Sequence, residues 1–337
     1  MARSRHLPAA ACVVAIILLA AALTACGSKG QGSTSATPMG SSPPASQSPS
    51  ATPTTPAIAA TSLPPAPVGA AVPTGFRATS VTFVSTDEGF VLGTAPGHGA
   101  VVARSRDRGA TWTRRAAPFV DIGWPQSQSG SAAGVWGIRF ATATHGFVFG
   151  RGLWETTDGG ATWTRVAAPA GSVLSLAAID GQVLALVQPS PSSQSATLLR
   201  RPLVGGSWTK ITTTKLYTTV DPTDLISTQA GTAAVLASGG VLVTRNGGLT
   251  FHTYPAPSTA SLAPAAVGVT SAGSLALLDG GGAAAGSVEK LVYVSANGGA
   301  TWTKAGAPSP GGDPVTIAGG SPATLLVGAA SGGSEIY

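Results

Sequence analysis

The chain has 337 residues, of which 43% are apolar and only 9% are charged, so it can bury a sizeable core. Its 45 glycines and 26 prolines argue against long helices, because glycine raises the entropic cost of ordering and proline lacks a backbone donor. This composition favours many short strands joined by tight turns. The formal charge of +6 includes no basic run, which argues against nucleic-acid binding.

The first 25 residues are typical of an export signal. Arg3 and Arg5 precede an apolar stretch that is shorter than the roughly 20 residues a membrane-spanning helix needs. The stretch ends in Leu23-Thr24-Ala25-Cys26, which resembles the lipobox of bacterial lipoproteins. That resemblance implies lipidation of Cys26 and anchoring to the extracytoplasmic face of the bacterial cell membrane. The alternative is an N-terminal membrane helix with an incidental cysteine.

Residues 26–72 have the composition of a disordered linker. Ser, Thr, Pro, Ala and Gly dominate, and Lys29 is the only charged residue. The segment lacks the regularly spaced large apolar residues that would offset the entropy of ordering. We therefore expect three parts: a signal at 1–25, this linker, and a folded domain at 73–337. Cys12, the only other cysteine, leaves with the signal, so we expect no disulfide in the folded domain.

Four segments of the folded part align without gaps and decide its fold. Each runs Ser/Thr-x-Asp/Asn-x-Gly-x-Thr and ends in an aromatic residue. The segments lie at 105–112, 156–163, 244–251 and 295–302. Before the shared glycine, the first segment has Arg108 and the other three have a second glycine. A weaker copy at 201–208 keeps Trp208. Successive aromatic ends are 43 to 51 residues apart. Repeats of about 40 to 50 residues are typical of propeller blades.

The segments resemble the Asp-box, or BNR, repeat. The resemblance implies an all-β β-propeller of about six four-stranded blades. The sixth repeat lacks a box, so either a strand just before Phe76 completes the last blade or the sequence is a fragment. The box side chains are expected to be structural, because Asp or Asn accepts turn hydrogen bonds and the aromatic ring fills space between sheets. They are Asp107, Trp112, Asp158, Trp163, Asn246, Phe251, Asn297 and Trp302.

No catalytic set is apparent, although Asp-box propellers include sialidases. The segment nearest to the sialidase Phe-Arg-Ile-Pro motif is Phe76-Arg77-Ala78-Thr79, which lacks Ile-Pro. Glu289 and Tyr293 are close in sequence, but a four-residue offset along a strand separates them by roughly 13 Å. The histidines lack metal-ligand spacing. We expect no catalytic residue, metal or cofactor, and keep a sialidase- or glycosidase-like hydrolase as the alternative.

A long connection at 116–135, between the first two blades, is the best candidate for ligand binding. Exposed aromatic side chains on a loop suit recognition of sugars or peptides, and nearby arginines add a possible anion site. The candidate residues are Phe119, Asp121, Trp124, Trp136, Arg77, Arg139 and Arg151. The alternative is that the two tryptophans fill the channel or a gap between blades and that the arginines are solvated surface residues.

The folded region also resembles bacterial YVTN/BNR-like propellers related to photosystem II assembly and stability factors. The resemblance rests on Gly146-Phe147-Val148-Phe149-Gly150 followed by the box at 156–163. It implies a non-enzymatic scaffold. We therefore expect a cell-surface lipoprotein that binds a protein or glycan through the propeller face.

Overall fold

The computed structural model describes residues 68–336 with ten gaps. These gaps are 124–133, 168, 217–225, 238–239, 258–261, 271–272, 285–286, 309–312, 322–323 and 332. In the described residues every regular element is a strand, and no helix long and apolar enough to cross a membrane is found there.

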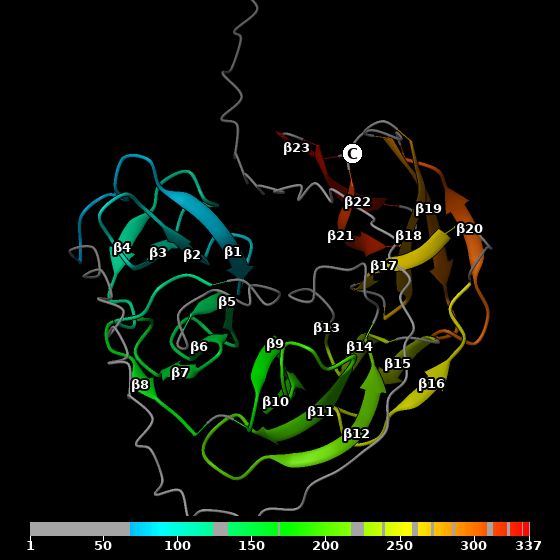
Figure 1. The fold of residues 1–337 in the computed structure, drawn as a ribbon, viewed down its shortest axis with the longest axis horizontal. Coiled ribbons are helices and arrows are strands. Elements are labelled where there is room, and N and C mark those ends of the chain that lie inside the picture. Colours follow the sequence, from blue (N-terminus) through cyan, green and yellow to red (C-terminus); the bar gives the residue numbers. More distant parts are fainter. Residues whose placement is uncertain are drawn as a thin grey trace, which may run out of the picture. The chain divides into compact units, whose positions relative to one another are not determined.

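The strands form six antiparallel sheets, each built from strands that follow one another in the sequence (Figure 1). The first three sheets consist of β1 (Arg77–Phe83), β2 (Gly89–Thr94), β3 (Ala100–Ser105) and β4 (Thr113–Arg115); β5 (Val135–Phe140), β6 (Gly146–Gly150), β7 (Leu153–Thr156) and β8 (Thr164–Arg165); and β9 (Ser172–Ile179), β10 (Gln182–Gln188), β11 (Ser195–Pro202) and β12 (Thr209–Lys215). The other three consist of β13 (Ile226–Gln229), β14 (Thr232–Ala237), β15 (Gly240–Thr244) and β16 (His252–Tyr254); β17 (Leu262–Val269), β18 (Leu275–Ala284), β19 (Ser287–Ser295) and β20 (Thr303–Gly306); and β21 (Asp313–Ser321), β22 (Thr324–Ser331) and β23 (Gly333–Ile336).

The middle strands of the sheets are nearly continuous apolar runs. In β10, Val183 to Val187 are all buried, and every residue of β14 is buried. Such runs arise when both faces of a sheet are covered, because alternate side chains then enter two different apolar interfaces. The fourth strands are polar by contrast, and both residues of β8 are exposed. Each sheet therefore has a buried centre and a solvated outer edge.

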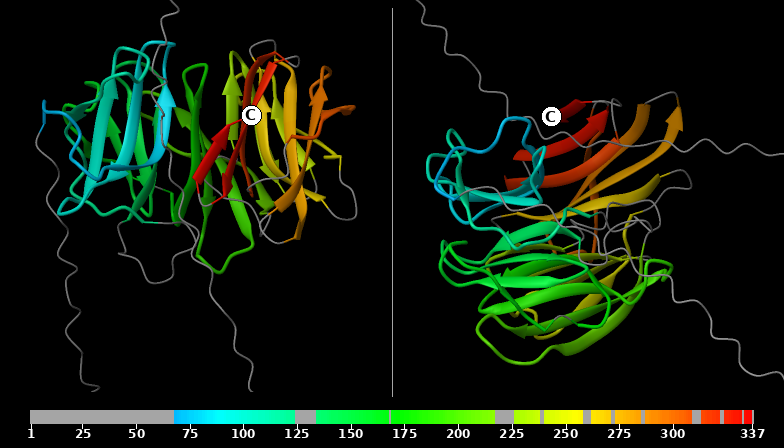
Figure 2. Two further views of the ribbon diagram at one scale, coloured as in Figure 1. Left: turned by 90° about the horizontal axis from the view of Figure 1, so that it is seen from above. Right: turned by 60° about the vertical axis from the view of Figure 1, so that its left-hand side comes forward.

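The first strands of successive sheets lie side by side around a central axis. β1 contacts β5, β5 contacts β9, and β9 contacts β13, followed by β17 and β21. Figures 1 and 2 show the sheets radiating from this axis with their first strands innermost. This arrangement is a β-propeller, and the predicted all-β fold class is confirmed.

The interface between the first two sheets illustrates how neighbouring sheets pack. Phe90 of β2 stacks on Phe140 of β5, with ring centroids 3.5 Å apart and planes 3° apart. Phe140 also meets Trp163 edge to face at 6.1 Å. Ile138 and Leu92 are fully buried in the same cluster. The sheets are therefore joined by interdigitated apolar side chains, which is the main source of stability in such a fold.

The sixth sheet has three strands in the described chain, where the other five have four. Residues 69–71 do not complete it. Gly69 N donates to Arg114 O, Arg114 N donates to Ala70 O, and Ala71 forms a bridge with Thr113. The stretch before Phe76 thus lies against β4 of the first sheet. Of the two alternatives for the last blade, closure by a strand just before Phe76 therefore does not hold for residues 69–71.

The four gap-free repeats form the same hydrogen-bonded turn between the third and fourth strands. In the second copy, the amides of Ala161 and Thr162 donate to Asp158 Oδ1 at 2.9 Å, and Thr162 Oγ1 donates to Oδ2 at 2.6 Å. Thr156 Oγ1 donates to Asp158 Oδ1 at 2.8 Å and accepts from the amide of Gly160. Equivalent bonds hold Asp107, Asn246 and Asn297.

The hydrogen bonds of these turns favour the ionised carboxylate. Donation by the side chain of Thr162 is the largest cause that lowers the pKa of Asp158 to about 2, and further donors outweigh the opposing effect of burial. Thr111 has the same effect on Asp107, whose pKa is also lowered to about 2. The turn is thus fixed by local bonds that the repeat itself supplies.

The tryptophans at the ends of the repeats connect neighbouring sheets. Trp163 Nε1 donates to Ala116 O at 2.8 Å, Trp208 Nε1 to Ala167 O at 3.2 Å, and Trp302 Nε1 to Pro255 O at 3.1 Å. Each acceptor lies four residues after the aromatic end of the preceding repeat. Each such tryptophan therefore binds the outer edge of the sheet before it.

Candidate ligand-binding site in the central channel

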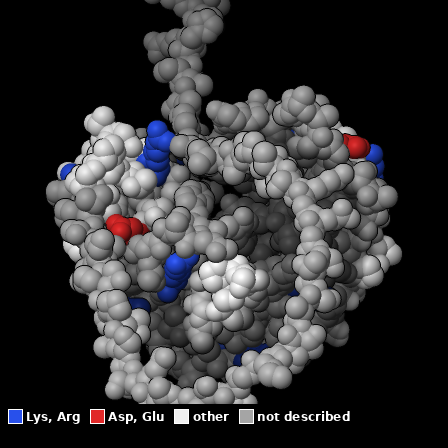
Figure 3. Space-filling model, in the orientation of Figure 1, with Lys and Arg blue, Asp and Glu red and all other residues white. Residues whose placement is uncertain are grey.

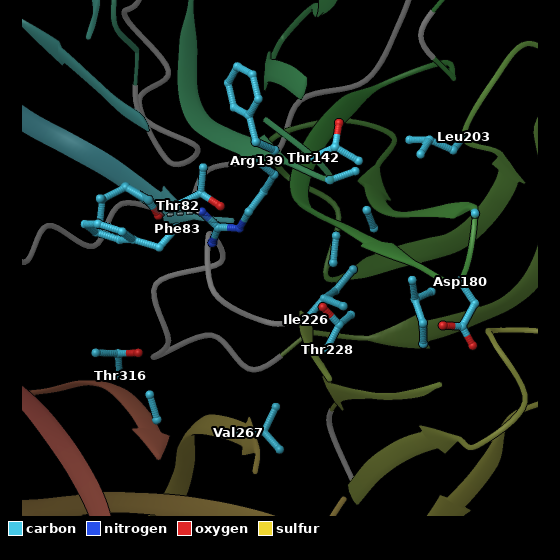
Figure 4. Close-up of a pocket in the computed structure, with 18 of the residues that line it drawn as sticks. Thr82, Phe83, Arg139, Thr142, Asp180, Leu203, Ile226, Thr228, Val267 and Thr316 are labelled. Atoms are coloured by element: carbon cyan, nitrogen blue, oxygen red, sulfur yellow. Dashed lines mark hydrogen bonds between the residues drawn. The ribbon is translucent and has the colours of Figure 1, made fainter. Parts of the chain in front are cut away.

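A cavity of about 590 Å³ lies among the first strands (Figure 4). All six sheets contribute to its wall. The contributions are Val81 to Phe83 from β1, Arg139 and Phe140 from β5, Ala177 to Ile179 from β9, Ile226 and Thr228 from β13, Val267 from β17, and Thr316 to Ala318 from β21. The turns after β5 and β9 add residues 141–142 and 180–181. The cavity is therefore a property of the assembled propeller, and no single repeat encloses it.

The cavity wall combines hydroxyl groups with apolar side chains. Its threonines are Thr82, Thr142, Thr228 and Thr316, and Phe83, Ile226 and Val267 are among its apolar members. Hydroxyls both donate and accept hydrogen bonds, and a few polar groups on an apolar wall are typical of small-ligand sites. The wall therefore suits a ligand with polar groups on an apolar frame, such as a sugar or a peptide segment.

Arg139 is the cationic member of the described wall. Its Nη1 donates to Ser80 Oγ at 3.2 Å, to Val81 O at 3.3 Å and to Ile138 O at 2.9 Å. These bonds join β5 to β1 and fix the guanidinium between them, as Figure 4 shows. In the space-filling view the same face is hollowed at its centre, with basic side chains nearby (Figure 3).

Asp180 is the acidic member of the wall. It follows β9 in the turn before β10 and adopts a positive φ of 44°, a conformation that Asp tolerates better than most residues. Gly231 and Gly247, in turns of the fourth sheet, lie next to the Asp180 carboxylate. A Cβ placed on either glycine would come within 3.4 Å of Asp180 Oδ2. Asp180 thus sits where the third and fourth sheets meet the cavity.

The predicted connection at 116–135 is only partly described. Phe119 is 60% exposed, as expected for a side chain that contacts a ligand. Asp121 accepts a hydrogen bond from the amide of Val135 through its backbone oxygen, and Ile122 forms a parallel bridge with Val135. Trp124 lies outside the described residues. None of these residues lines the cavity in the part of the wall that is described.

Trp136 was predicted to contact a ligand, but it lies in the protein core. It is 1% exposed and belongs to the apolar core shared with the third sheet, where its Nε1 donates to Leu174 O at 3.3 Å. A side chain so enclosed has no surface for a ligand. Its role is to fill the space between sheets, which was the alternative interpretation of this residue.

The three predicted arginines do not form one patch in the described wall. Only Arg139 lines the cavity. Arg77 is exposed at the start of β1, and Arg151 lies in the turn between β6 and β7, where its amide donates to Gly134 O. Because β1 and β5 run away from the connection at 116–135, the cavity forms at their far ends.

Sequence reasoning did not predict Asp180 or the threonines as site residues. One signal was nevertheless present. Thr82-Phe83 and Arg139-Phe140 occupy equivalent positions at the ends of first strands, and both pairs line the cavity. The register of the repeats therefore contained the positions of two wall segments, but only the arrangement of the six sheets in space shows that their first strands line one cavity.

Two groups of partly or fully buried ion pairs lie outside the cavity among the described residues. Glu155 on β7 binds Arg201 Nη2 on β11 at 2.8 Å and His145 Nε2 at 2.6 Å, so it links the second sheet to the third. Arg104 pairs with Glu88 within the first sheet. No group of three or more metal-binding side chains occurs in the described part of the chain. These pairs have the character of structural links between neighbouring elements.

Asp279 on β18 is the exception among the buried charges. It is 0% exposed, and neither carboxylate oxygen has a hydrogen-bond partner in the described part of the chain. Burial raises its pKa to about 7, because a charge is poorly solvated in an apolar interior. Its strand neighbours across the sheet are Pro264 and Leu291, neither of which offers a side-chain donor. Asp279 lies away from the cavity wall.

Comparison with known proteins supports the fold. No family model and no curated protein matches the sequence. Among solved structures, an ancestral GH74 enzyme is 18% identical, covers 81% of this chain and has a TM-score of 0.52, and this chain spans 37% of its length. A structure of YCF48 bound to D1 peptide is 16% identical, with 82% and 99% of the two chains covered and a TM-score of 0.44. YCF48 from Cyanidioschyzon merolae is 17% identical, with 78% and 95% covered and a TM-score of 0.43. At these identities, the similarity to the GH74 enzyme concerns the β-propeller fold alone.

Proposed function

We propose that this chain is a non-enzymatic binding propeller that takes a segment of a protein or glycan into its central channel. The observation that carries the proposal is the cavity of about 590 Å³ to which all six sheets contribute. Threonine hydroxyls can bind hydroxyl and amide groups, Arg139 can bind a carboxylate or a hydroxyl, and the apolar side chains can cover the frame of a sugar or peptide.

The carboxylate content of the described wall favours binding over hydrolysis. Hydrolysis of a glycosidic bond usually needs two carboxyl groups about 5 to 10 Å apart, one of which acts as the acid. Around the cavity, the described residues include a single carboxylate, that of Asp180. A sialidase- or glycosidase-like hydrolase remains the second candidate, and glycan cleavage that Asp180→Asn abolishes would establish it.

A binding screen tests the proposal directly. The full chain would be applied to glycan and peptide arrays, and each hit would be measured by titration calorimetry. We expect Thr228→Val to weaken a true channel ligand about tenfold, because the change removes a wall hydroxyl and keeps the shape of the side chain. Arg77→Gln, an exposed change away from the wall, is the matched control. Equal affinity in Thr228→Val, Thr142→Val and Arg139→Lys variants would contradict a channel site.

We further propose that the propeller is exported and held at the membrane by a lipid on Cys26. The support for this is the lipobox at residues 23–26 and the linker composition that follows it. Cells grown with a radiolabelled fatty acid should label the full chain and should not label the Cys26→Ala variant. Cys12→Ala should keep the label, because residue 12 lies before the expected cleavage site. Label retained in Cys26→Ala would contradict the anchor.

A further inference from the structure

The turn between the third and fourth strands of the third sheet differs from the same turn in the four complete repeats. It has Leu203 where the complete repeats have Asp or Asn, and then Val204 where they have Arg108 or a glycine. Val204 is 81% exposed, the highest value among the exposed large apolar side chains of the described chain. This turn therefore lacks the box carboxylate or amide and presents an aliphatic side chain to solvent.

The equivalent turn of the fourth sheet carries a second exposed aliphatic side chain. Leu249 is 60% exposed, and the other three complete repeats have alanine at its position. The hydrogen bonds of this turn do not use the leucine side chain, because Asn246 accepts from the amide of Thr250 and donates to its hydroxyl. Neither the turn nor burial within the propeller therefore accounts for a leucine at this position.

Asp180 and Gly181, in the turn after β9, lie between these two turns. Leu203 N donates to Gly181 O at 2.7 Å, which holds the turn of the third sheet against them. On the other side, a Cβ placed on Gly247 would lie 3.2 Å from Asp180 Cβ, so the turn of the fourth sheet is in contact as well. We call the surface formed by Val204, Asp180 and Leu249 the lip.

The lip is continuous with the central cavity. Asp180, Gly181 and Leu203 also line the cavity wall. Figure 4 shows Asp180 and Leu203 on one side of the cavity and Phe83 on the other. A ligand that leaves the cavity on the side of Asp180 would therefore meet a carboxylate flanked by two aliphatic side chains.

We propose that the partner of the propeller is a polypeptide that rests an apolar side chain on Val204 and Leu249 and pairs an adjacent lysine or arginine with Asp180. The inference rests on the proposed channel site and narrows its ligand to a peptide. Aliphatic groups on the lip gain from covering apolar side chains, which a protein segment supplies. A glycan would instead lose hydrogen bonds between its hydroxyls and water at this surface.

Three pools of fluorescein-labelled hexapeptides test the lip. Each pool has mixed residues at four positions and a fixed central pair, which is Leu-Lys in the first pool, Ser-Lys in the second and Leu-Glu in the third. In anisotropy titrations with the full chain, we expect the Leu-Lys pool to saturate at a concentration at least about tenfold lower than the other two, because they lose an apolar contact or place like charges together.

Variants of the protein locate the peptide. Leu249→Ala introduces the alanine of the other complete repeats, and Val204→Ser changes an exposed side chain, so both should fold, as circular dichroism would show. Each should weaken binding of the Leu-Lys pool about threefold, because part of one aliphatic contact is lost. Asp180→Asn should remove the preference for Leu-Lys over Leu-Glu. Val68→Ala, which shortens an exposed aliphatic side chain outside the lip, is the matched control and should leave affinity unchanged.

Equal binding of the three pools, or unchanged affinity in both Leu249→Ala and Val204→Ser, would overturn the proposal. Thr228→Val separates this result from failure of the channel site. A loss in Thr228→Val alone would keep the channel and remove the lip, whereas a loss in the lip variants alone would keep the lip and contradict the channel. Binding found only on a glycan array would overturn the peptide partner and leave the channel site. No saturation by any pool and no array ligand would overturn both.

Discussion

Asp158 and Asp279 place the same side chain in opposite surroundings. At the end of the second sheet, four donors surround the carboxylate of Asp158 and lower its pKa to about 2. Within the fifth sheet, Asp279 has no donor in the described structure, and burial raises its pKa to about 7. The first environment is made by residues within four positions of Asp158, and the second by neighbouring strands and sheets. The comparison separates what a local motif stabilises from what tertiary packing imposes.

The largest expected effect concerns Asp279. Because its folded pKa is raised from 3.8 to about 7, the folded state holds the proton more tightly than the unfolded state does. The stabilising contribution of protonated Asp279 is therefore fully present below pH 4. As the pH rises to about 7, the free energy of unfolding falls by about 1.4 kcal/mol per pH unit, or about 4 kcal/mol in total. Asp279→Asn should remove this loss. Urea unfolding at pH 4 and pH 9 measures it, with exposed Asp180→Asn as control. An equal effect of Asp279→Asn at both pH values would contradict the assignment.

Asp158→Ala tests the other member of the comparison. The change removes the acceptor of four hydrogen bonds, and we expect a loss of about 1 to 2 kcal/mol at pH 7, as for other capping side chains. The pKa of Asp158 is lowered, so its contribution is present above pH 4 and is lost as pH falls through about 2. Asp158→Asn should cost less, because Asn246 makes the equivalent bonds. Chemical unfolding of the two variants at pH 7 decides the order.

The Trp163→Phe variant tests whether the tryptophan of a repeat stabilises the packing of its sheet on the preceding sheet. The variant keeps the ring contacts and removes the 2.8 Å bond to Ala116 O, at an expected cost of about 1 kcal/mol. Trp112→Phe is the matched control, because Trp112 donates to no equivalent carbonyl in the described chain. Equal losses of unfolding free energy in the two variants would show that the inter-sheet bond contributes nothing.

The smallest effect is expected at Arg108. It has a positive φ of 63°, where the other three complete repeats have glycines at 159, 247 and 298. Arg108→Gly should raise stability by about 0.5 to 1 kcal/mol, since a side chain in the left-handed region costs energy and the exposed ion pair with Asp87 contributes little. Arg106→Gly in the same turn should give no gain. A loss in Arg108→Gly would mean that the ion pair outweighs the backbone strain.

Much of the fold was predictable because the spacing of the repeats indicates the blades directly. The spacing of the box aromatics indicated propeller blades, and each of the four gap-free boxes lies between the third and fourth strands of its sheet. The site was less predictable. Arg139 was named as a candidate and lines the cavity, whereas Trp136 was also named as a candidate and is buried, because it lies on β5 and packs into the core shared with the third sheet.

The sequence by itself determined the turns and strands, since hydrogen bonds within eight residues and alternating apolar side chains act over short distances. Only the tertiary structure decided which side chains meet. The cavity wall draws Phe83, Arg139, Asp180 and Thr316 from four different sheets. The burial of Phe140 likewise depends on another sheet, because Phe90 of the first sheet stacks on its ring. Burial depends on what the neighbouring sheet provides, and no single repeat carries that information.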